Sequence, residues 1–298
     1  MSLQELEALR VKARNQLLFG LIGSLVLGIG LGFVTMLPPV GVIVFAVGLI
    51  ATTIISNKST RAYTLAFKNA YVLKSLEQVF DNLQYHPEVG LDRSVIADTQ
   101  MMYMGDRYTS NDFISGKYKN INVVQADVHI EEEETTTDSD GNTTTYWVTL
   151  FLGRWMIFDF NKTFKANVQV CQKGFGNNRV NTLFSKTKYQ KVSMEDQDFN
   201  NKYKTFAQNE HDAFYILTPS LMEKIKRVAD SVDGKLLLCF IDNKLHVGLQ
   251  NGKDSFEPSI WKKIDEATVL DAISKDIRII TQFVDELNLD NDLFRGEV

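Results

Sequence analysis

Side chains that could do chemistry are few in this chain and lie far apart in its sequence. None of the four histidines is three or four residues from another, so no pair of them can bind a metal ion from one face of a helix. The dipeptide His211-Asp212 occurs in metal-dependent phosphohydrolases, but that chemistry needs further histidine and aspartate ligands. A glycine-rich phosphate loop, a nucleophile elbow and a Cys-x-x-Cys motif are all absent from the sequence. We therefore expect no catalytic residue, cofactor or metal ion, although a site assembled from scattered residues would leave little local signal.

An acidic segment, Asp138-Ser139-Asp140-Gly141-Asn142, offers alternating oxygen ligands of the kind that bind calcium. An EF-hand loop would need glycine at its sixth position, glutamate at its twelfth, and a helix on each side. Here Gly141 comes too early, and the flanking residues alternate like strands. The segment is therefore predicted to be the Asp-Gly turn of a long hairpin with a solvent-exposed, acidic and threonine-rich tip.

Two apolar stretches dominate the start of the chain, at residues 17–37 and 40–56, and neither contains a charged residue. As helices they would extend about 30 Å and about 25 Å, which suits the hydrocarbon core of a bilayer. Between them, Pro38-Pro39 ends the first helix, because proline lacks an N–H and disfavours helix in the residue before it. We predict a transmembrane helical hairpin at residues 17–56. A buried core hairpin in a soluble protein is the alternative.

Basic residues flank the outer ends of this hairpin, whereas the Pro-Pro turn has none. The positive-inside rule therefore predicts a multi-pass membrane protein with both termini in the cytoplasm and the turn outside. No ionisable residue lies inside either stretch, which disfavours a transporter. The flanking basic residues are Arg10, Lys12 and Arg14 before the hairpin, and Lys58, Arg61, Lys68 and Lys74 after it.

Small residues recur at every fourth position of the first stretch: Gly20, Ser24, Gly28 and Gly32. This spacing places them on one face of the helix, where they permit close approach of another backbone. The face would pack either against the second stretch of the same chain or against another copy of the protein. The sequence leaves both open.

The rest of the chain has the periodicities of an α+β fold. We expect a cytoplasmic segment at residues 1–16, the hairpin, a helical stalk at 57–84 ended by Tyr85-His86-Pro87, and a soluble domain at 85–298. In this domain a mixed, mainly antiparallel sheet carries packed helices. Strands are predicted at 124–130, 148–160, 164–171, 189–194, 235–241 and 245–249, a mobile loop at 175–187, and helices after Thr218-Pro219 and over 270–287.

Strand register can be predicted for two hairpins by requiring all apolar side chains to lie on one face. The acidic hairpin then pairs Ile130 with Leu150 and Val128 with Leu152. The strand at 124–130 would be half-buried, with Gln125, Asp127 and His129 on its solvent face. A turn at Asp242-Asn243 pairs three further positions: Phe240 with Leu245, Leu238 with Val247, and Leu236 with Leu249.

Composition adds two expectations. The net charge of -5, without a basic stripe, gives no indication of nucleic-acid binding. Cys171 and Cys239 both lie in apolar, strand-like segments, so we expect them to be reduced core residues of a cytoplasmic domain.

Several short segments stand in an order that resembles a bacterial membrane-protein family known only as a domain of unknown function. The resemblance implies two N-terminal spans in the bacterial inner (cytoplasmic) membrane followed by one α+β domain, and it makes a LemA-type small membrane protein a candidate partner. It implies no catalytic role. The segments are Tyr85-His86-Pro87, residues 108–116 with Asp112, Phe151-Leu152-Gly153, residues 158–164, and residues 215–219 ending in Thr218-Pro219.

Polar residues within these segments are the best candidates for a site. Asp159 and Lys162 stand among aromatic residues and form either a structural ion pair or a ligand contact. Our leading hypothesis is a membrane-anchored cytoplasmic domain that binds a protein partner or acts as a scaffold, with self-association as a further candidate. The alternative is an enzyme or small-ligand sensor with a pocket near Asp112, Asp159 and Lys162.

Overall fold

The computed structural model describes residues 1–160, 167–175 and 189–289. It divides the chain into two compact units. The first comprises residues 1–75 and 256–274, and the second comprises residues 76–255 and 275–298.

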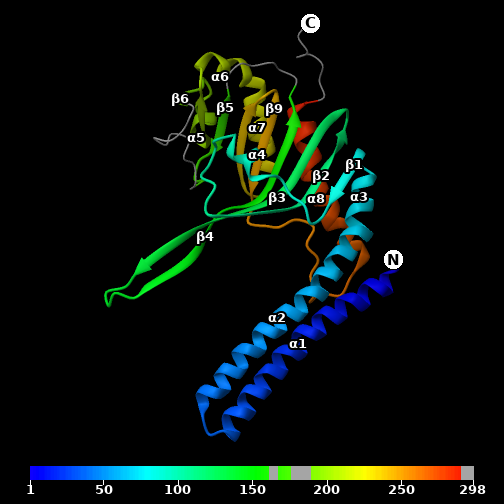
Figure 1. Cartoon of the computed structure of the whole chain (residues 1–298). Helices are drawn as coiled ribbons and strands as arrows, with labels where there is room; N and C mark the ends of the chain where they lie inside the picture. Colours follow the sequence, from blue (N-terminus) through cyan, green and yellow to red (C-terminus); the bar gives the residue numbers. More distant parts are fainter. Residues whose placement is uncertain (161–166, 176–188, 290–298) are drawn as a thin grey trace. The chain divides into compact units, whose positions relative to one another are not determined.

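Two long helices form most of the first unit, α1 at Leu3–Val34 and α2 at Pro38–Phe67, and they pack side by side (Figure 1). The side chain of Ser2 caps α1 by accepting a hydrogen bond from the Glu5 N–H, and the Glu5 carboxylate reaches back to the Ser2 N–H. Pro38 begins α2, where its missing N–H costs nothing. A π-helical turn, η1 at Lys68–Val72, and a short helix, α3 at Leu73–Glu77, continue α2.

Both long helices are apolar and long enough to cross a membrane. In their most apolar stretches only 11% and 17% of the residues are buried, so large apolar side chains such as Phe19 (71% exposed) face outward. A core helix of a soluble protein would bury these side chains instead. The two helices are therefore candidate membrane spans that associate this chain with a membrane.

The helix that follows the second span is shorter than predicted. It ends at Glu77, and β1 begins at Asp81 and includes Tyr85 and His86. Asn82 lies inside β1 with a φ of 52°, a left-handed conformation that asparagine tolerates, at the point where β1 shifts register against β2 between Asp81 and Gln84. Pairing with β2 then satisfies the backbone groups of β1.

A nine-stranded sheet, counted over the described residues, forms the centre of the second unit, in the order β1-β2-β3-β4-β9-β8-β5-β7-β6. Every pairing in it is antiparallel, so the α+β prediction is confirmed. The strands are β1 (Asp81–His86), β2 (Arg107–Tyr118), β3 (Ile121–Thr137), β4 (Thr143–Asp159), β5 (Val168–Gln172), β6 (Gln190–Val192), β7 (Tyr203–Ala207), β8 (Lys235–Ile241) and β9 (Lys244–Gln250).

Both faces of the central strands are covered. On one face, Ile96 of α4 and Met101 pack into a core with Trp155 and Leu237. On the other, Phe283 of α8 stacks on Phe158, with 6.0 Å between the ring centroids. The helices of this unit are α4 (Arg93–Ala97), α5 (Gln197–Lys202), α6 (Glu210–Ile216), α7 (Pro219–Ser231) and the second half of α8 (Glu266–Leu287).

Local predictions agree with this unit at its turns and caps. Thr218 caps α7 by accepting from the Leu221 N–H, and Pro219 is the first helical residue. The register of the β8–β9 hairpin is confirmed at all three predicted pairs. The strand predicted at 164–171 is β5, although residues 161–166 lie outside the described part of the chain, as does most of the predicted mobile loop.

The predicted register of the β3–β4 hairpin is wrong beyond its tip. Thr137 pairs with Thr143 and Glu131 with Thr149, as the turn requires, but a β-bulge follows between Ile130 and Glu131. Ile130 therefore pairs with Phe151, and Val128 pairs with Gly153. One extra residue in β4 shifts every later pair by one position, which the local apolar pattern could not reveal.

Candidate functional site

The small-residue face of α1 lies against α2 of the same chain. Ser24 packs against Gly48, where an added Cβ would come within 2.6 Å of the Ser24 hydroxyl, and Gly20 faces Thr52. Near the turn, an added Cβ on Gly28 would lie 2.9 Å from the carbonyl oxygen of Gly41, and one on Gly32 would lie 3.5 Å from the Gly41 Cα. All four small residues of α1, at positions 20, 24, 28 and 32, thus contact the second helix, as packing within one chain requires.

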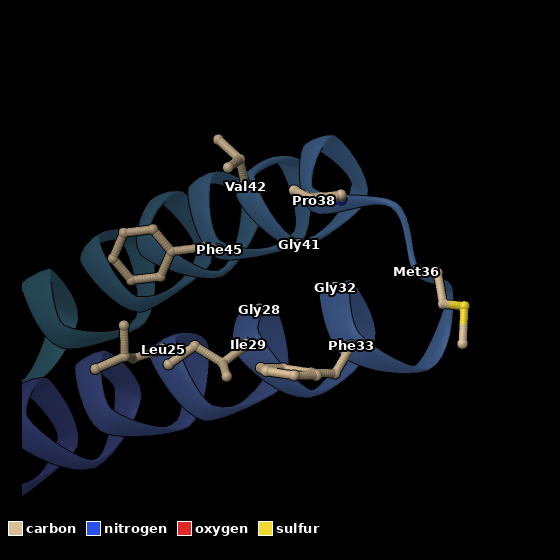
Figure 2. A pocket seen from close by; sticks show the side chains of 10 residues that line it. All are labelled: Leu25, Gly28, Ile29, Gly32, Phe33, Met36, Pro38, Gly41, Val42 and Phe45. Carbon is tan, nitrogen blue, oxygen red and sulfur yellow. The ribbon is translucent and has the colours of Figure 1, made fainter.

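The turn end of this helical hairpin also has a groove of about 560 Å³ (Figure 2). Only apolar side chains and glycines line it, so it offers no side-chain charge or hydrogen-bonding group to a polar solute. Glycines at three positions leave the space between the helices open. The lining residues are Leu25, Gly28, Ile29, Gly32, Phe33, Met36, Pro38, Gly41, Val42 and Phe45.

In the second unit, a buried polar cluster joins β3 and β4 to later parts of the chain. Asp127 and Arg154 are cross-strand partners, and both are buried. The Ser255 hydroxyl donates to Asp127 Oδ1 at 3.0 Å and accepts from Arg154 Nε at 2.5 Å, while the Ser255 N–H donates to Asp127 Oδ2. The Arg154 Nη atoms donate to the main-chain oxygen and to Oδ1 of Asp276 in α8, each at 2.5 Å.

The carboxyl of Asp127 combines a raised pKa with hydrogen bonds that join two segments of the chain. Burial raises the pKa of its carboxyl well above the usual range, although Arg154 opposes the shift. A raised carboxyl pKa is common in active sites. Here, however, both carboxylate oxygens already accept hydrogen bonds from Ser255. The cluster therefore fixes Ser255 and α8 to the sheet.

The sequence did not predict this cluster, and the placement of Asp127 on a solvent face is wrong. Gln125 and Asp127 are both buried, because α8 covers the face that the alternating pattern assigned to water. Arg154, in the middle of an otherwise apolar strand, was the available signal, since a buried cation requires a partner. Ser255 and Asp276 gave no such signal, as they are more than 100 residues away in sequence from Arg154.

Asp112 is fully buried, in a bulge of β2. It has a φ of 53°, its carboxylate accepts from the Tyr85 hydroxyl at 2.6 Å and from the Asn111 amide at 3.0 Å, and its N–H donates to the Pro87 carbonyl. These contacts tie the Tyr85-His86-Pro87 segment to β2.

Asp159 lies far from Asp112 in the sheet. It ends β4 and accepts from the Asn122 amide at 2.5 Å. Asn111, the neighbour of Asp112, pairs with Asp127 of β3, and Asp127 pairs with Arg154 of β4. Arg154 precedes Asp159 by five residues along β4. Five strand residues extend about 17 Å, so these two aspartates do not share a site. Lys162 lies outside the described residues, and its pairing with Asp159 stays a prediction.

A histidine and a cysteine lie next to each other on the face of the sheet opposite to the Asp127–Arg154 cluster. His246 pairs with Cys239 across β8 and β9, and its Nδ1 accepts from the Trp155 Nε1–H at 3.3 Å. Burial, together with nearby Lys244, lowers the pKa of His246 to about 4, and burial raises the pKa of the Cys239 thiol. A neutral imidazole beside a protonated thiol is a poor nucleophilic pair. Cys171 and Cys239 are both buried free thiols.

A two-stranded ribbon is the most exposed feature of the second unit. Beyond the bulge, residues 132–137 of β3 and 143–148 of β4 leave the sheet together and end in the turn at 138–142; we call these residues the ribbon (Figure 1). Asp138 stabilises the turn by accepting from the N–H groups of Asp140 and Asn142. At the base of the ribbon, the Arg107 guanidinium lies 3.7 Å from the centre of a Trp147 ring.

Residues 149–289, from the middle of β4 to the end of α8, match the model of a family described as "Protein of unknown function (DUF3137)". The predicted family resemblance is confirmed there. The match covers somewhat less than half of the chain and includes Arg154, Ser255 and Asp276. Curated proteins give no match.

Among solved structures, the chain is similar to the crystal structure of the mycobacterial trehalose monomycolate transport factor A, TtfA. The two are 11% identical with a TM-score of 0.39, and the comparison covers 76% of this chain and 94% of that one. A likeness at this level carries no inference about this chain.

Proposed function

We propose that this chain is a membrane-anchored interaction or scaffold protein of the bacterial inner membrane. The α1–α2 hairpin spans the bilayer, both termini lie in the cytoplasm, and the α+β domain presents its ribbon to a protein partner. The distribution of Lys and Arg supports the orientation. The exposed apolar surface of the two helices supports the anchor.

The observation that carries the interaction role is the open edge of the ribbon. β2 pairs with β3 only as far as Glu131, and β9 pairs with β4 only from Gly153 onward. In the described part of the chain, no strand covers the outer edge of residues 143–149. A two-stranded hairpin is marginally stable by itself, and open strand edges are ready sites for pairing with another chain.

Side chains on the two strands of the ribbon differ in a way that suits β-strand addition. The β3 strand carries Glu132, Glu133 and Glu134, and charge on an edge discourages pairing. The β4 strand is uncharged from residue 143 to residue 149 and carries two exposed aromatic residues, Tyr146 and Trp147. Main-chain pairing along β4 would supply affinity, and the aromatic side chains would supply specificity.

The charge of the ribbon indicates which kind of partner it can bind. The ribbon and its turn contain five acidic residues and no Lys or Arg. We therefore infer a partner with a basic, extended segment on the cytoplasmic side of the same membrane. A LemA-type membrane protein is the first candidate through the family resemblance, and a second copy of this chain is the other.

Site-specific photo-cross-linking tests this proposal. We would place a photoreactive phenylalanine at Trp147 or, as a matched control, at Phe214 of α6, since each native side chain is 40% exposed. In native membranes the Trp147 position should give a discrete cross-linked species, at least several-fold above the Phe214 position. Mass spectrometry then distinguishes a LemA-type partner, a second copy and another protein.

A second variant tests whether the ribbon itself is needed. Replacing residues 133–147 by a two-residue Asn-Gly turn should keep the sheet, because β2 and β9 still flank β3 and β4. An affinity-tagged variant should lose the partner after chemical cross-linking. Undiminished recovery of the same partner would contradict the role of the ribbon.

A further inference from the structure

One segment of the first unit is neither part of the hairpin nor apolar along its length. Residues 256–264 lie beside α1 and α2 (orange in Figure 1) and contain the tripeptide Trp261-Lys262-Lys263. All three side chains are exposed, and Trp261 is 55% exposed. More than half of the Trp261 surface is therefore free to contact something outside the unit, beside two exposed cations.

Polar contacts fix this segment to the two helices. The guanidinium of Arg10 is buried, donates from Nη1 to the carbonyl oxygen of Ile260 at 2.7 Å and also binds the Glu7 carboxylate. Glu7 in turn accepts from the Ile264 N–H at 3.4 Å. The buried ammonium of Lys68 pairs with Glu257. The segment is therefore held at both ends and in its middle.

These contacts also give the level of the segment relative to the predicted spans. Arg10 precedes the first apolar stretch by seven residues, about 10 Å along the helix, and Lys68 follows the second by twelve, about 18 Å. Glu7 lies a further helical turn out from Arg10. Measured along the helix axes, the segment thus comes closer to the apolar stretches from Glu257 to Ile260, and it is farther from them again at Ile264. Its closest part is residues 260–263, near the headgroup layer that borders the hydrocarbon core.

We propose that residues 260–263 form a third membrane contact, which binds anionic lipid headgroups of the bilayer that holds the hairpin. Trp261 inserts its ring at the interface, where tryptophan is enriched because it is apolar with one N–H donor. Lys262 and Lys263 attract negatively charged headgroups, as basic residues near an anionic membrane surface do. Exposed Lys12, Lys58 and Arg61 of the same unit add positive charge on this side. The inference rests on the proposed membrane insertion of α1 and α2.

Fluorescence quenching in proteoliposomes tests the contact with the full chain. Trp147 is first replaced by Phe, which leaves Trp155, fully buried in the core, and Trp261. This background, W147F, is compared with W147F/W261F in vesicles of phosphatidylcholine and phosphatidylglycerol that carry a headgroup spin label. We expect quenching in the first protein and its loss, at least three-fold, in the second. Equal quenching in both would overturn the proposal.

The choice of lipid and a charge variant test the anionic preference. Quenching should fall at least two-fold in pure phosphatidylcholine, and the pair K262Q/K263Q should show the same fall in mixed vesicles. Quenching that is equal in both lipids would overturn the headgroup recognition. As a control, thermal unfolding should show that each substitution of an exposed residue leaves the fold intact.

Flotation of the vesicles after alkaline extraction separates this proposal from the one on which it rests. A chain that does not float with the lipid refutes the inserted hairpin. A chain that floats while Trp261 is unquenched refutes only the third contact.

Discussion

At the scale of single residues, Arg154 makes the contacts that bring distant parts of the second unit together. Its guanidinium joins β4 to Ser255 and to Asp276 of α8, across more than 100 residues of chain. Buried charges that lose a partner are destabilising, because the remaining polar groups stay out of water without their hydrogen bonds.

Arg154→Ala should therefore lower the free energy of unfolding by about 3–5 kcal/mol, measured by urea denaturation of the full chain in detergent. The matched control is Arg107→Ala, which removes a half-exposed guanidinium from an ion pair with Glu131 and from the Trp147 ring and should cost about 1 kcal/mol. Equal losses for the two variants would show that the Arg154 cluster does not hold the unit together.

His246 should make stability depend on pH. Its pKa in the folded protein is about 4, below its ordinary value of 6.5, so the unfolded chain takes up the proton first as the pH falls. The contribution is complete above about pH 7 and is lost between pH 6.5 and 4. It amounts to about 3 kcal/mol at most, since each pKa unit corresponds to about 1.4 kcal/mol.

His246→Asn isolates this effect, because asparagine keeps an acceptor near the Trp155 N–H but does not titrate. Between pH 7 and 4 the wild type should lose up to about 3 kcal/mol more stability than the variant, measured by urea denaturation. Asp127, whose raised pKa acts in the opposite direction, is present in both chains and cancels. Parallel pH profiles would mean that His246 is not held neutral by burial.

At the scale of elements, the helical hairpin depends on the close approach of two backbones. Gly41→Leu would drive a side chain against Gly28 and Gly32, whereas around Gly30 nothing lies within 4 Å of an added Cβ. Overpacking of a tight contact costs about 1–3 kcal/mol. Gly41→Leu should therefore lower the melting temperature in detergent, and Gly30→Leu should not.

Gly30→Leu also tests self-association through the outward face of α1, which does not include Gly20, Ser24, Gly28 or Gly32. If the chain also self-associates in the membrane through an outward face, Gly30→Leu should change the chemically cross-linked oligomers while leaving the melting temperature unchanged. Without self-association through that face, Gly30→Leu should change neither the oligomers nor the melting temperature.

At the scale of the whole molecule, the orientation across the membrane can be tested because Cys171 and Cys239 are buried free thiols that give little background labelling. We expect Met36→Cys, between the spans, to react with an impermeant maleimide in intact cells whose outer membrane is permeabilised. Ser139→Cys, at the tip of the ribbon, should react only after the inner membrane is lysed. Labelling of Ser139→Cys before lysis would overturn the cytoplasmic placement.

Features determined by the sequence alone are those encoded over a few residues. The two apolar helices, the cap at Thr218-Pro219 and the register around Asp242-Asn243 all depend on local periodicity, capping and turn chemistry. The resemblance at residues 149–289 also came from short segments in order.

Only the tertiary structure decided the features that depend on contacts between distant residues. The bulge between Ile130 and Glu131 sets the register of β3 and β4, and α8 turns the expected solvent face of β3 into core. The burial of Asp127, its raised pKa and its bonds to Ser255 follow from that cover. Burial is a property of the packed chain, because it depends on which distant segment covers a side chain.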